Sequence, residues 1–346
     1  MNPKDTNISV ASNCYNNILT KMKSASSMKG LEVRDIVSLA FHHVKPRIHR
    51  AHPPPWKEKP AIINLHGLFG SHIMYHSLNR LMVQKFETDI YSLDLRNHGN
   101  SPRAAPYDYV TLTDDVIQFV RNNIYNETPG RPLYLTGFSL GGRVALLATL
   151  SRLLNVQKCI SIDLPPYTIP ELDKHFTGNC DLVNRIANRE IKIERGSDNW
   201  KDNVLAMFKE LPVNDSTSGQ NLALYFANGF LSVKANHDKS LSSRDDYIDY
   251  ATPVHWMPDL AEEVKRWPER KELNPMMYRY QSEVSTLFMK GLQSEFIKRD
   301  YSLLKEHFPN SEVKEFNCGH NILMDFPKES FDTIIEFFSR KQHKQH

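Results

Sequence analysis

The 346-residue sequence lacks any apolar run long enough to cross a bilayer. Its apolar stretch at residues 144–150 is far shorter than the roughly 20 residues that a transmembrane helix needs. The amino terminus has no apolar h-region, so we expect no cleaved secretory signal peptide. The 43 basic and 40 acidic residues give a net charge of only +3, so we expect no nucleic-acid partner.

Cysteine is scarce and scattered. The four cysteines form no C-x-x-C pair, so neither a zinc ribbon nor a thioredoxin-type redox site is encoded, and a reducing compartment is expected. The adjacent His42 and His43 fall in an expected edge strand and alternate between its faces, so no metal is needed to explain them. We expect no metal site and no resident cofactor.

The amino-terminal segment is short of acids and of arginine. Residues 1–31 contain one acid, Asp5, against four lysines, and no arginine occurs before Arg34. Few acids and many Ser and Asn residues suit a mitochondrial presequence, although such segments are typically rich in arginine. We interpret residues 1–34 as an amino-terminal extension, either a mitochondrial presequence or an unstructured terminus of a cytoplasmic protein.

From residue 60 onward, short apolar segments alternate with segments of helical period, a pattern typical of a parallel sheet covered by helices. The expected strands are residues 61–65, 90–93, 133–136, 158–163, 284–290 and 313–316, with an antiparallel edge strand within 36–44. The expected helices include residues 78–84, 112–123, 141–154 and 331–338.

The alternation fails between the strands at 158–163 and 284–290. That stretch contains charged helical pieces at 181–195 and 260–271 and loop residues at 214–219, which indicates an insertion over one sheet edge. We therefore divide the chain into a core, a lid insertion and two terminal segments: residues 35–165 with 284–340, residues 166–283, and residues 1–34 and 341–346.

The segment GFSLGG at 137–142 follows one expected strand and leads directly into a helix. This is the G-x-S-x-G pattern in the strand, sharp turn and helix context that it requires. The turn exposes the hydroxyl of Ser139 beside a helix amino terminus, whose free N–H groups favour negative charge. Ser139 is the predicted nucleophile.

A second loop, HGLFGS at 66–71, rises from the first buried strand. Its glycines allow the N–H of Leu68 to meet a developing oxyanion, with the N–H of Leu140 as the second donor. We predict that these two amides form an oxyanion hole and that His66 has a structural role.

His320 stands in the segment FNCGH at 316–320, after the last expected strand and before the last helix. A glycine-flexed loop at that sheet edge can carry an imidazole to Ser139, so His320 is the predicted general base.

The acid is less obvious. In many hydrolases of this kind the catalytic acid follows the strand that corresponds here to residues 284–290. In this sequence Gln293 and Ser294 fill the expected position after that strand, and Glu295 is out of phase. Asp163 ends the strand before that one. Neighbouring strands are about 4.8 Å apart, so Asp163 can reach the histidine Nδ1, and we assign it as the acid.

The loop at 94–102, DLRNHGNSP, also combines an acid, a cation and a histidine. We expect Asp94 and Arg96 to pair and brace a loop beside the site. Catalysis by His98 is the less favoured interpretation.

Five segments in one chain order resemble a known family: residues 66–71, 94–102, 137–142, the I-D-x-x-P segment at 162–166 and C-G-H at 318–320. Over about residues 35–340 the sequence is similar to the α/β-hydrolase family that joins yeast ethanol acetyltransferases to mitochondrial abhydrolase-domain-containing proteins. The resemblance implies a mostly parallel central sheet flanked by helices, with an inserted helical lid. It also implies an acid from the earlier strand, in agreement with Asp163.

The resemblance implies transfer of an acetyl group from acetyl-CoA to ethanol through a serine acyl-enzyme, with esterase and thioesterase side activity. The partners would then be a small thioester or ester and a short-chain alcohol, with acetyl-CoA a substrate rather than a cofactor. Two alternatives stay open: a mitochondrial carboxylesterase or thioesterase without useful transfer, and a non-catalytic binding protein. All three predicted catalytic residues are present, which disfavours the last.

Overall fold

A computed structural model of the chain describes residues 36–46, 55–102, 104–166, 174–187, 190–193, 199–214, 217–231 and 281–340. Three predicted segments lie outside these ranges: the amino-terminal extension at 1–34, the helical piece at 260–271 and the carboxyl-terminal tail at 341–346. The division into core, lid and terminal segments stays a prediction.

One seven-stranded sheet forms the centre, in the order β1-β3-β2-β4-β5-β6-β7. All neighbouring strands are parallel except β1, which pairs antiparallel with β3. The strands are β1 (Phe41–Val44), β2 (Ala61–Leu65), β3 (Ile90–Leu93), β4 (Leu133–Phe138), β5 (Val156–Ile162), β6 (Ser285–Gly291) and β7 (Ser311–Phe316). The six predicted parallel strands are confirmed, each within two residues at either end.

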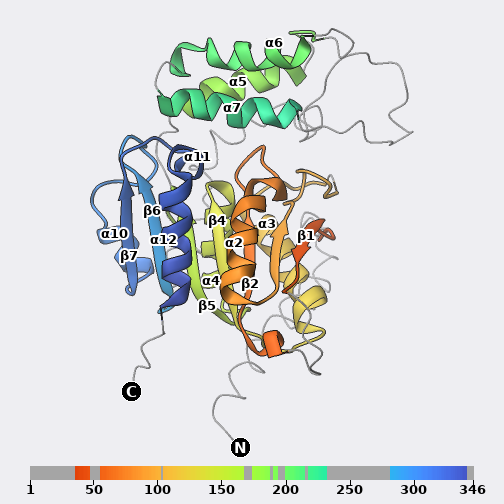
Figure 1. Cartoon of the computed structure of the whole chain (residues 1–346), viewed down its shortest axis with the longest axis vertical. Helices are drawn as coiled ribbons and strands as arrows, with labels where there is room; N and C mark the ends of the chain where they lie inside the picture. Colours follow the sequence, from red (N-terminus) through yellow and green to blue (C-terminus); the bar gives the residue numbers. More distant parts are fainter. Residues whose placement is uncertain are drawn as a thin grey trace, which may run out of the picture.

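Helices cover both faces of the sheet (Figure 1). Outside the segment between β5 and β6, the helical elements are η2 (Pro55–Glu58), η3 (His72–Tyr75), α2 (His76–Phe86), α3 (Tyr109–Val120), η4 (Arg121–Tyr125), α4 (Leu140–Leu150), α10 (Ser302–His307), α11 (Ile322–Asp325) and α12 (Pro327–Ser339). Alternate residues of β2 serve the two cores: Ile63 packs with the α3 and α4 side, and Ile62 with the α2 and α12 side. Burial on both faces explains why the strands are apolar throughout.

Between β5 and β6 the chain forms α5 (Lys174–Ala187), α6 (Trp200–Lys209), η5 (Pro212–Asn214) and α7 (Thr217–Leu231). Figure 1 shows α5, α6 and α7 as a layer beyond the carboxyl ends of the strands. The expected helical piece at 181–195 is helical over 181–187, within α5, but residues 190–193 are not helical. The loop expected over 214–219 is also too long, since α7 begins at Thr217.

Two other boundaries differ from expectation for visible reasons. The edge strand begins at Phe41 rather than near residue 36, because side chains already accept the amides of Val37 and Ala40: Asp115 Oδ1 at 2.9 Å and Ser101 Oγ at 2.8 Å. Helix α4 ends at Leu150 rather than at 154, because Arg152 has a left-handed backbone with φ +57°.

Candidate active site

Ser139 occupies the sharp turn between β4 and α4. Its backbone, with φ +50° and ψ −117°, is one that residues with a side chain rarely adopt. The amide of Ser139 donates to the carbonyl of Ile162 at 2.8 Å, which ties the turn to β5. The sheet therefore supports the strained turn. Ser139 itself is buried, with 7% of its surface exposed.

The glycines around Ser139 are required by crowding. A Cβ at Gly137 would lie 2.1 Å from the carbonyl oxygen of Gly141, and one at Gly141 would lie 2.3 Å from that of Leu65. Real Cβ contacts are never so short, so only glycine permits the end of β2, the turn and the start of α4 to pack together.

His320 follows β7 and lies between the other two predicted residues. Its Nε2 is 2.9 Å from Ser139 Oγ, and its Nδ1 is 2.7 Å from Asp163 Oδ2. With a proton on Nδ1 donated to the carboxylate, Nε2 accepts from the serine hydroxyl, which is the arrangement of a general base. The rings of Phe296 and Phe138, with centroids 4.4 Å and 5.0 Å from that of His320, confine the imidazole.

Asp163 stands immediately after β5, completely buried and with a left-handed backbone of φ +54°. Its amide donates to the carbonyl of Met289 at 2.8 Å, and its Oδ1 accepts from the amide of Gly291 at 3.0 Å. The neighbouring strand β6 therefore holds both the backbone and one carboxylate oxygen, leaving Oδ2 for His320.

Burial raises the pKa of the Asp163 carboxyl. Hydrogen bonds from His320, the Ser294 hydroxyl and the Gly291 amide oppose this effect by stabilising the ionised form. Ser294 is thus a partner of the acid, a role that the sequence alone did not reveal, although Ser294 stands at the position where related chains were expected to carry an aspartate.

The other acid considered, Glu295, is exposed, and so is Gln293. The side-chain Nε2 of Gln293 is 3.4 Å from Asn317 Oδ1, and the backbone N–H of Gln293 donates to the carbonyl of Cys318. Asp163 is therefore the carboxylate that the structure places beside His320.

The two predicted oxyanion donors lie on adjoining segments. Leu140 is the first residue of α4, where an N–H has no partner within the helix. Leu68 is buried in the loop after β2, and the start of α4 packs against the carbonyls of Leu65 and His66 at the base of that loop. Their joint role as an oxyanion hole stays a prediction.

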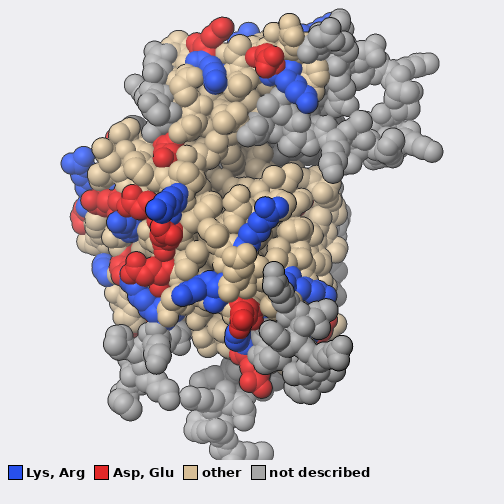
Figure 2. Space-filling model, viewed as in Figure 1, with Lys and Arg blue, Asp and Glu red and all other residues tan. Residues whose placement is uncertain are grey.

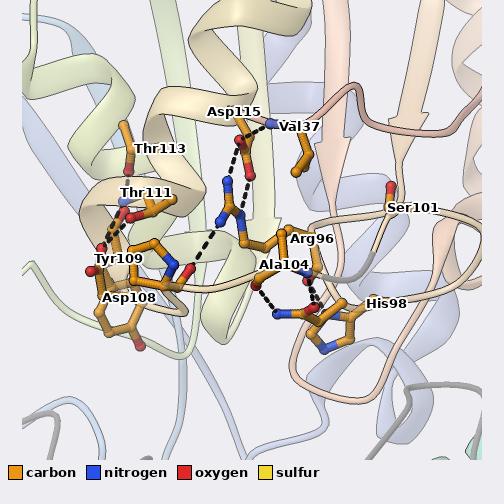
Figure 3. Close-up of polar contacts among 12 residues, drawn as sticks. Val37, Arg96, His98, Ser101, Ala104, Asp108, Tyr109, Thr111, Thr113 and Asp115 are labelled. Carbon is orange, nitrogen blue, oxygen red and sulfur yellow. Dashed lines mark hydrogen bonds and ion pairs between the residues drawn. The ribbon is translucent and has the colours of Figure 1, made fainter. Parts of the chain in front are cut away.

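The loop after β3 is built differently from expectation, since Asp94 and Arg96 do not pair. Asp94 accepts from the amides of His72 at 2.7 Å and Asn100 at 2.9 Å. Arg96 instead forms a bidentate ion pair with Asp115 of α3, at 2.6 and 2.8 Å (Figure 3). A cation at this depth requires a carboxylate that bonds with it through two N–H groups, and Asp94 is already held by backbone amides.

His66 and His98 are both completely buried, and each is hydrogen bonded to a backbone amide of the other loop. His66 Nε2 accepts from Leu95, and His98 Nε2 accepts from Phe69. The histidine that bonds with Ser139 and Asp163 is His320. His66 and His98 therefore hold the loop after β2 and the loop after β3 together.

Nothing in the described ranges has the form of a metal centre: no group of three or more His, Cys, Asp or Glu side chains there could hold an ion. His43 Nε2 is 2.9 Å from Asp89 Oδ1, and the ring of His42 stacks on that of His72. Cys159, Cys180 and Cys318 are all buried.

None of the helices in the described part of the chain has the length and apolar character of a membrane span. Figure 2 shows one face of the molecule, on which charged side chains gather over the sheet layer. The band between that layer and the helices α5–α7 carries few charges on this face (Figure 2).

The family follows from this fold together with a direct match. The family model for the alpha/beta hydrolase fold matches residues 60–327, which is most of the chain. The protein therefore belongs to the alpha/beta hydrolase fold family, and the predicted fold class is confirmed.

Within that family the chain is similar to yeast proteins. It is 29% identical over 326 residues to a probable alcohol acetyltransferase of Wickerhamomyces anomalus, covering 93% of this chain and 91% of the relative. It is 28% identical to ethanol acetyltransferase 1 of Cyberlindnera jadinii, covering 92% and 91%. The predicted resemblance to yeast ethanol acetyltransferases is confirmed.

Solved structures agree on the fold. A marine microorganism esterase superposes with a TM-score of 0.63 at 19% identity, covering 87% of this chain and 99% of that one. E-2-(acetamidomethylene)succinate hydrolase superposes with a TM-score of 0.61 at 17% identity, covering 88% and 96%.

Proposed function

We propose that this protein is an acetyl-CoA:ethanol O-acetyltransferase that forms ethyl acetate through a serine acyl-enzyme. The proposal is supported chiefly by the continuous hydrogen-bonded row from Ser139 through His320 to Asp163. The names of the yeast relatives favour an acetyl donor and an alcohol acceptor.

In the first half-reaction, Ser139 Oγ attacks the thioester carbonyl while His320 Nε2 takes the hydroxyl proton. Asp163 stabilises the imidazolium that results. The N–H groups of Leu68 and Leu140 receive the negative charge on the carbonyl oxygen. The carbon–sulfur bond then breaks, His320 returns its proton to the sulfur, and CoA leaves as a thiol, with the acetyl group on Ser139.

In the second half-reaction, His320 takes the proton of ethanol as the alcohol oxygen attacks the acetyl-serine. The tetrahedral intermediate collapses, the proton passes to Ser139 Oγ, and ethyl acetate departs. All bonds and protons balance without a resident metal or cofactor, so acetyl-CoA acts only as a substrate.

Water is the competing acceptor and gives acetate by the same steps. With water at about 55 M and ethanol at about 10 mM, transfer must favour the alcohol by roughly 5,000-fold, or about 5 kcal/mol, to compete evenly. Esterase and thioesterase activity are therefore expected beside transfer. A carboxylesterase or thioesterase without useful transfer is the outcome if this preference is missing.

The test is product analysis of the purified full chain with acetyl-CoA and ethanol. Gas chromatography measures ethyl acetate, and a thiol reagent measures released CoA. We expect ester in the wild type and neither product above background in Ser139→Ala. Release of CoA with acetate but without ester would contradict the transferase proposal and leave a thioesterase.

We further propose that residues 1–34 direct the protein to mitochondria. Their low acid content supports this proposal. These residues lie outside the described part of the chain and include none of the site residues. A fusion of residues 1–34 to a fluorescent protein should co-localise with mitochondria in yeast cells. A diffuse cytoplasmic signal would contradict this proposal without affecting the chemistry.

A further inference from the structure

The peptide unit between Leu68 and Phe69 is held at both of its polar ends. Its carbonyl, that of Leu68, accepts from the hydroxyl of Tyr225 at 2.6 Å. Its N–H, that of Phe69, donates to Nε2 of His98 at 3.1 Å. In a planar trans peptide these two groups point in opposite directions, so the two bonds together determine the orientation of the whole unit.

The preceding peptide unit, between Gly67 and Leu68, is held through its carbonyl. The Gly67 oxygen accepts from the Gly70 amide at 3.0 Å and from Nδ1 of His66 at 2.7 Å. His66 Nε2 accepts from the Leu95 amide, so the ring proton is on Nδ1. Because the trans peptide directs the Leu68 N–H away from that carbonyl, its direction is set as well.

His98 is suited to a permanent acceptor role. Its Nδ1 donates to the carbonyl of Arg96 at 2.9 Å, which leaves Nε2 with a lone pair for Phe69. Burial, reinforced by the nearby His66, lowers the pKa of His98 to about 3, so the ring stays neutral. The loop that carries it is anchored by the Arg96 and Asp115 ion pair, as Figure 3 shows.

Tyr225 comes from α7, on the chain segment between β5 and β6. Its ring packs edge-on against Phe138 of β4, with centroids 5.9 Å apart, and a Cβ at Gly67 would lie 3.1 Å from its hydroxyl. A second contact from α7 joins Asn221 to Asp325 of α11, shortly after His320. Helix α7 therefore contacts both the loop that carries Leu68 and the segment that follows His320.

We propose that Tyr225 and His98 are positioning residues: by holding the peptide between Leu68 and Phe69 they fix the backbone on the carboxyl side of Leu68, and so keep its N–H, which the bonds to the Gly67 carbonyl direct, in place for the oxyanion of acyl transfer. This inference rests on the proposed function. It makes the oxyanion donor depend on the seating of α7, so the helices beyond the sheet take part in the chemistry as well as covering the site.

The test compares Tyr225→Phe, which removes one hydroxyl and keeps the ring, with Tyr125→Phe. The hydroxyl of Tyr125 also binds a backbone group, because it accepts from the amide of Asn155, but that residue lies between α4 and the start of β5. With p-nitrophenyl acetate we expect kcat of Tyr225→Phe to fall about tenfold while KM stays within about twofold, since the lost stabilisation belongs to the transition state. Tyr125→Phe should match the wild type in kcat.

A second pair of variants examines the other end of the same peptide. His98→Leu removes the acceptor, whereas the side-chain oxygen of His98→Gln can accept from Phe69, so we expect Gln to recover part of the rate that Leu loses. Because both bonds hold one peptide unit, the loss in Tyr225→Phe with His98→Leu should be smaller than the product of the single losses. Full independence of the two, or an unchanged kcat in both, would overturn the inference.

The rate of Ser139 labelling by a fluorophosphonate separates this inference from the proposed function, because the phosphonyl oxygen also needs the oxyanion donors. Slower labelling in Tyr225→Phe with no ester from ethanol in the wild type would support the inference and overturn the transferase. Equal labelling in all variants would overturn the inference alone. A wild-type Ser139 that does not react at all would overturn both.

Discussion

The carboxylate of Asp163 lies 2.7 Å from the Nδ1 of His320, although the two residues are 157 positions apart. Strand β5 brings the acid to the carboxyl edge of the sheet, and the loop after β7 brings the histidine, with β6 between them. The amide of Gly291, at the end of β6, holds the second carboxylate oxygen. The intervening strand thus orients the acid that reaches past it.

Replacing Asp163 by Asn should lower kcat by about three to four orders of magnitude, because the amide neither stabilises an imidazolium nor maintains the proton on Nδ1. Hydrolysis of p-nitrophenyl acetate measures the loss. The matched control is Glu295→Gln, which removes an exposed carboxylate from the loop after β6 and should leave kcat unchanged. Near wild-type activity in Asp163→Asn would mean that another group supplies the acid.

Adding Gln293→Asp to Asp163→Asn tests the position where an acid was first expected. The exposed side chain of Gln293 is near Asn317 rather than His320, so the double variant should stay as inactive as Asp163→Asn alone. Recovery of more than about tenfold in kcat, roughly 1.4 kcal/mol, would show that the loop can bring a carboxylate to His320.

Arg96→Met should reduce the free energy of unfolding by about 3–5 kcal/mol, because it leaves the buried Asp115 carboxylate without its cation. Arg340→Met provides the comparison, since its pair with Glu312 is about half exposed and should be worth at most about 1 kcal/mol. Urea unfolding followed by circular dichroism measures both. Equal losses in the two variants would contradict the distinction drawn from burial.

Asp94 predicts a pH dependence of stability. Burial alone would raise its pKa, but hydrogen bonds from His72 and Asn100 outweigh burial and hold the pKa below its usual value. The folded state then favours the ionised form, so the stabilisation is present above the ordinary pKa of about 4 and is lost as the pH falls below it. The wild type should exceed Asp94→Asn by about 1–3 kcal/mol near neutral pH.

That difference between wild type and Asp94→Asn should shrink as the pH is lowered below about 4. The exposed Asp332→Asn serves as the control and should follow the wild type throughout. Urea unfolding at a series of pH values makes the comparison. A difference that grows on acidification would reverse the sign expected here.

Most of the core could be predicted from local sequence patterns. The parallel strands were predictable because burial on both faces makes them apolar, and Ser139 was predictable because its neighbours must be glycine. Helices α6 and α7 were missed, since their mixed polarity gives a weak signal between better defined elements. The pairing of Arg96 with Asp115 and the bond from Tyr225 to Leu68 join residues 19 and 157 positions apart, and only the fold specifies such partners.

The acyl-enzyme itself is the most direct measurement of the central claim. Rapid mixing of the full chain with acetyl-CoA, acid quenching and peptide mass analysis should find one acetyl group on Ser139, which disappears when ethanol is added before the quench. Ser139→Ala should carry none. Ethyl acetate or CoA formed at full rate with Ser139 never acetylated, or formed equally by Ser139→Ala, would contradict the account.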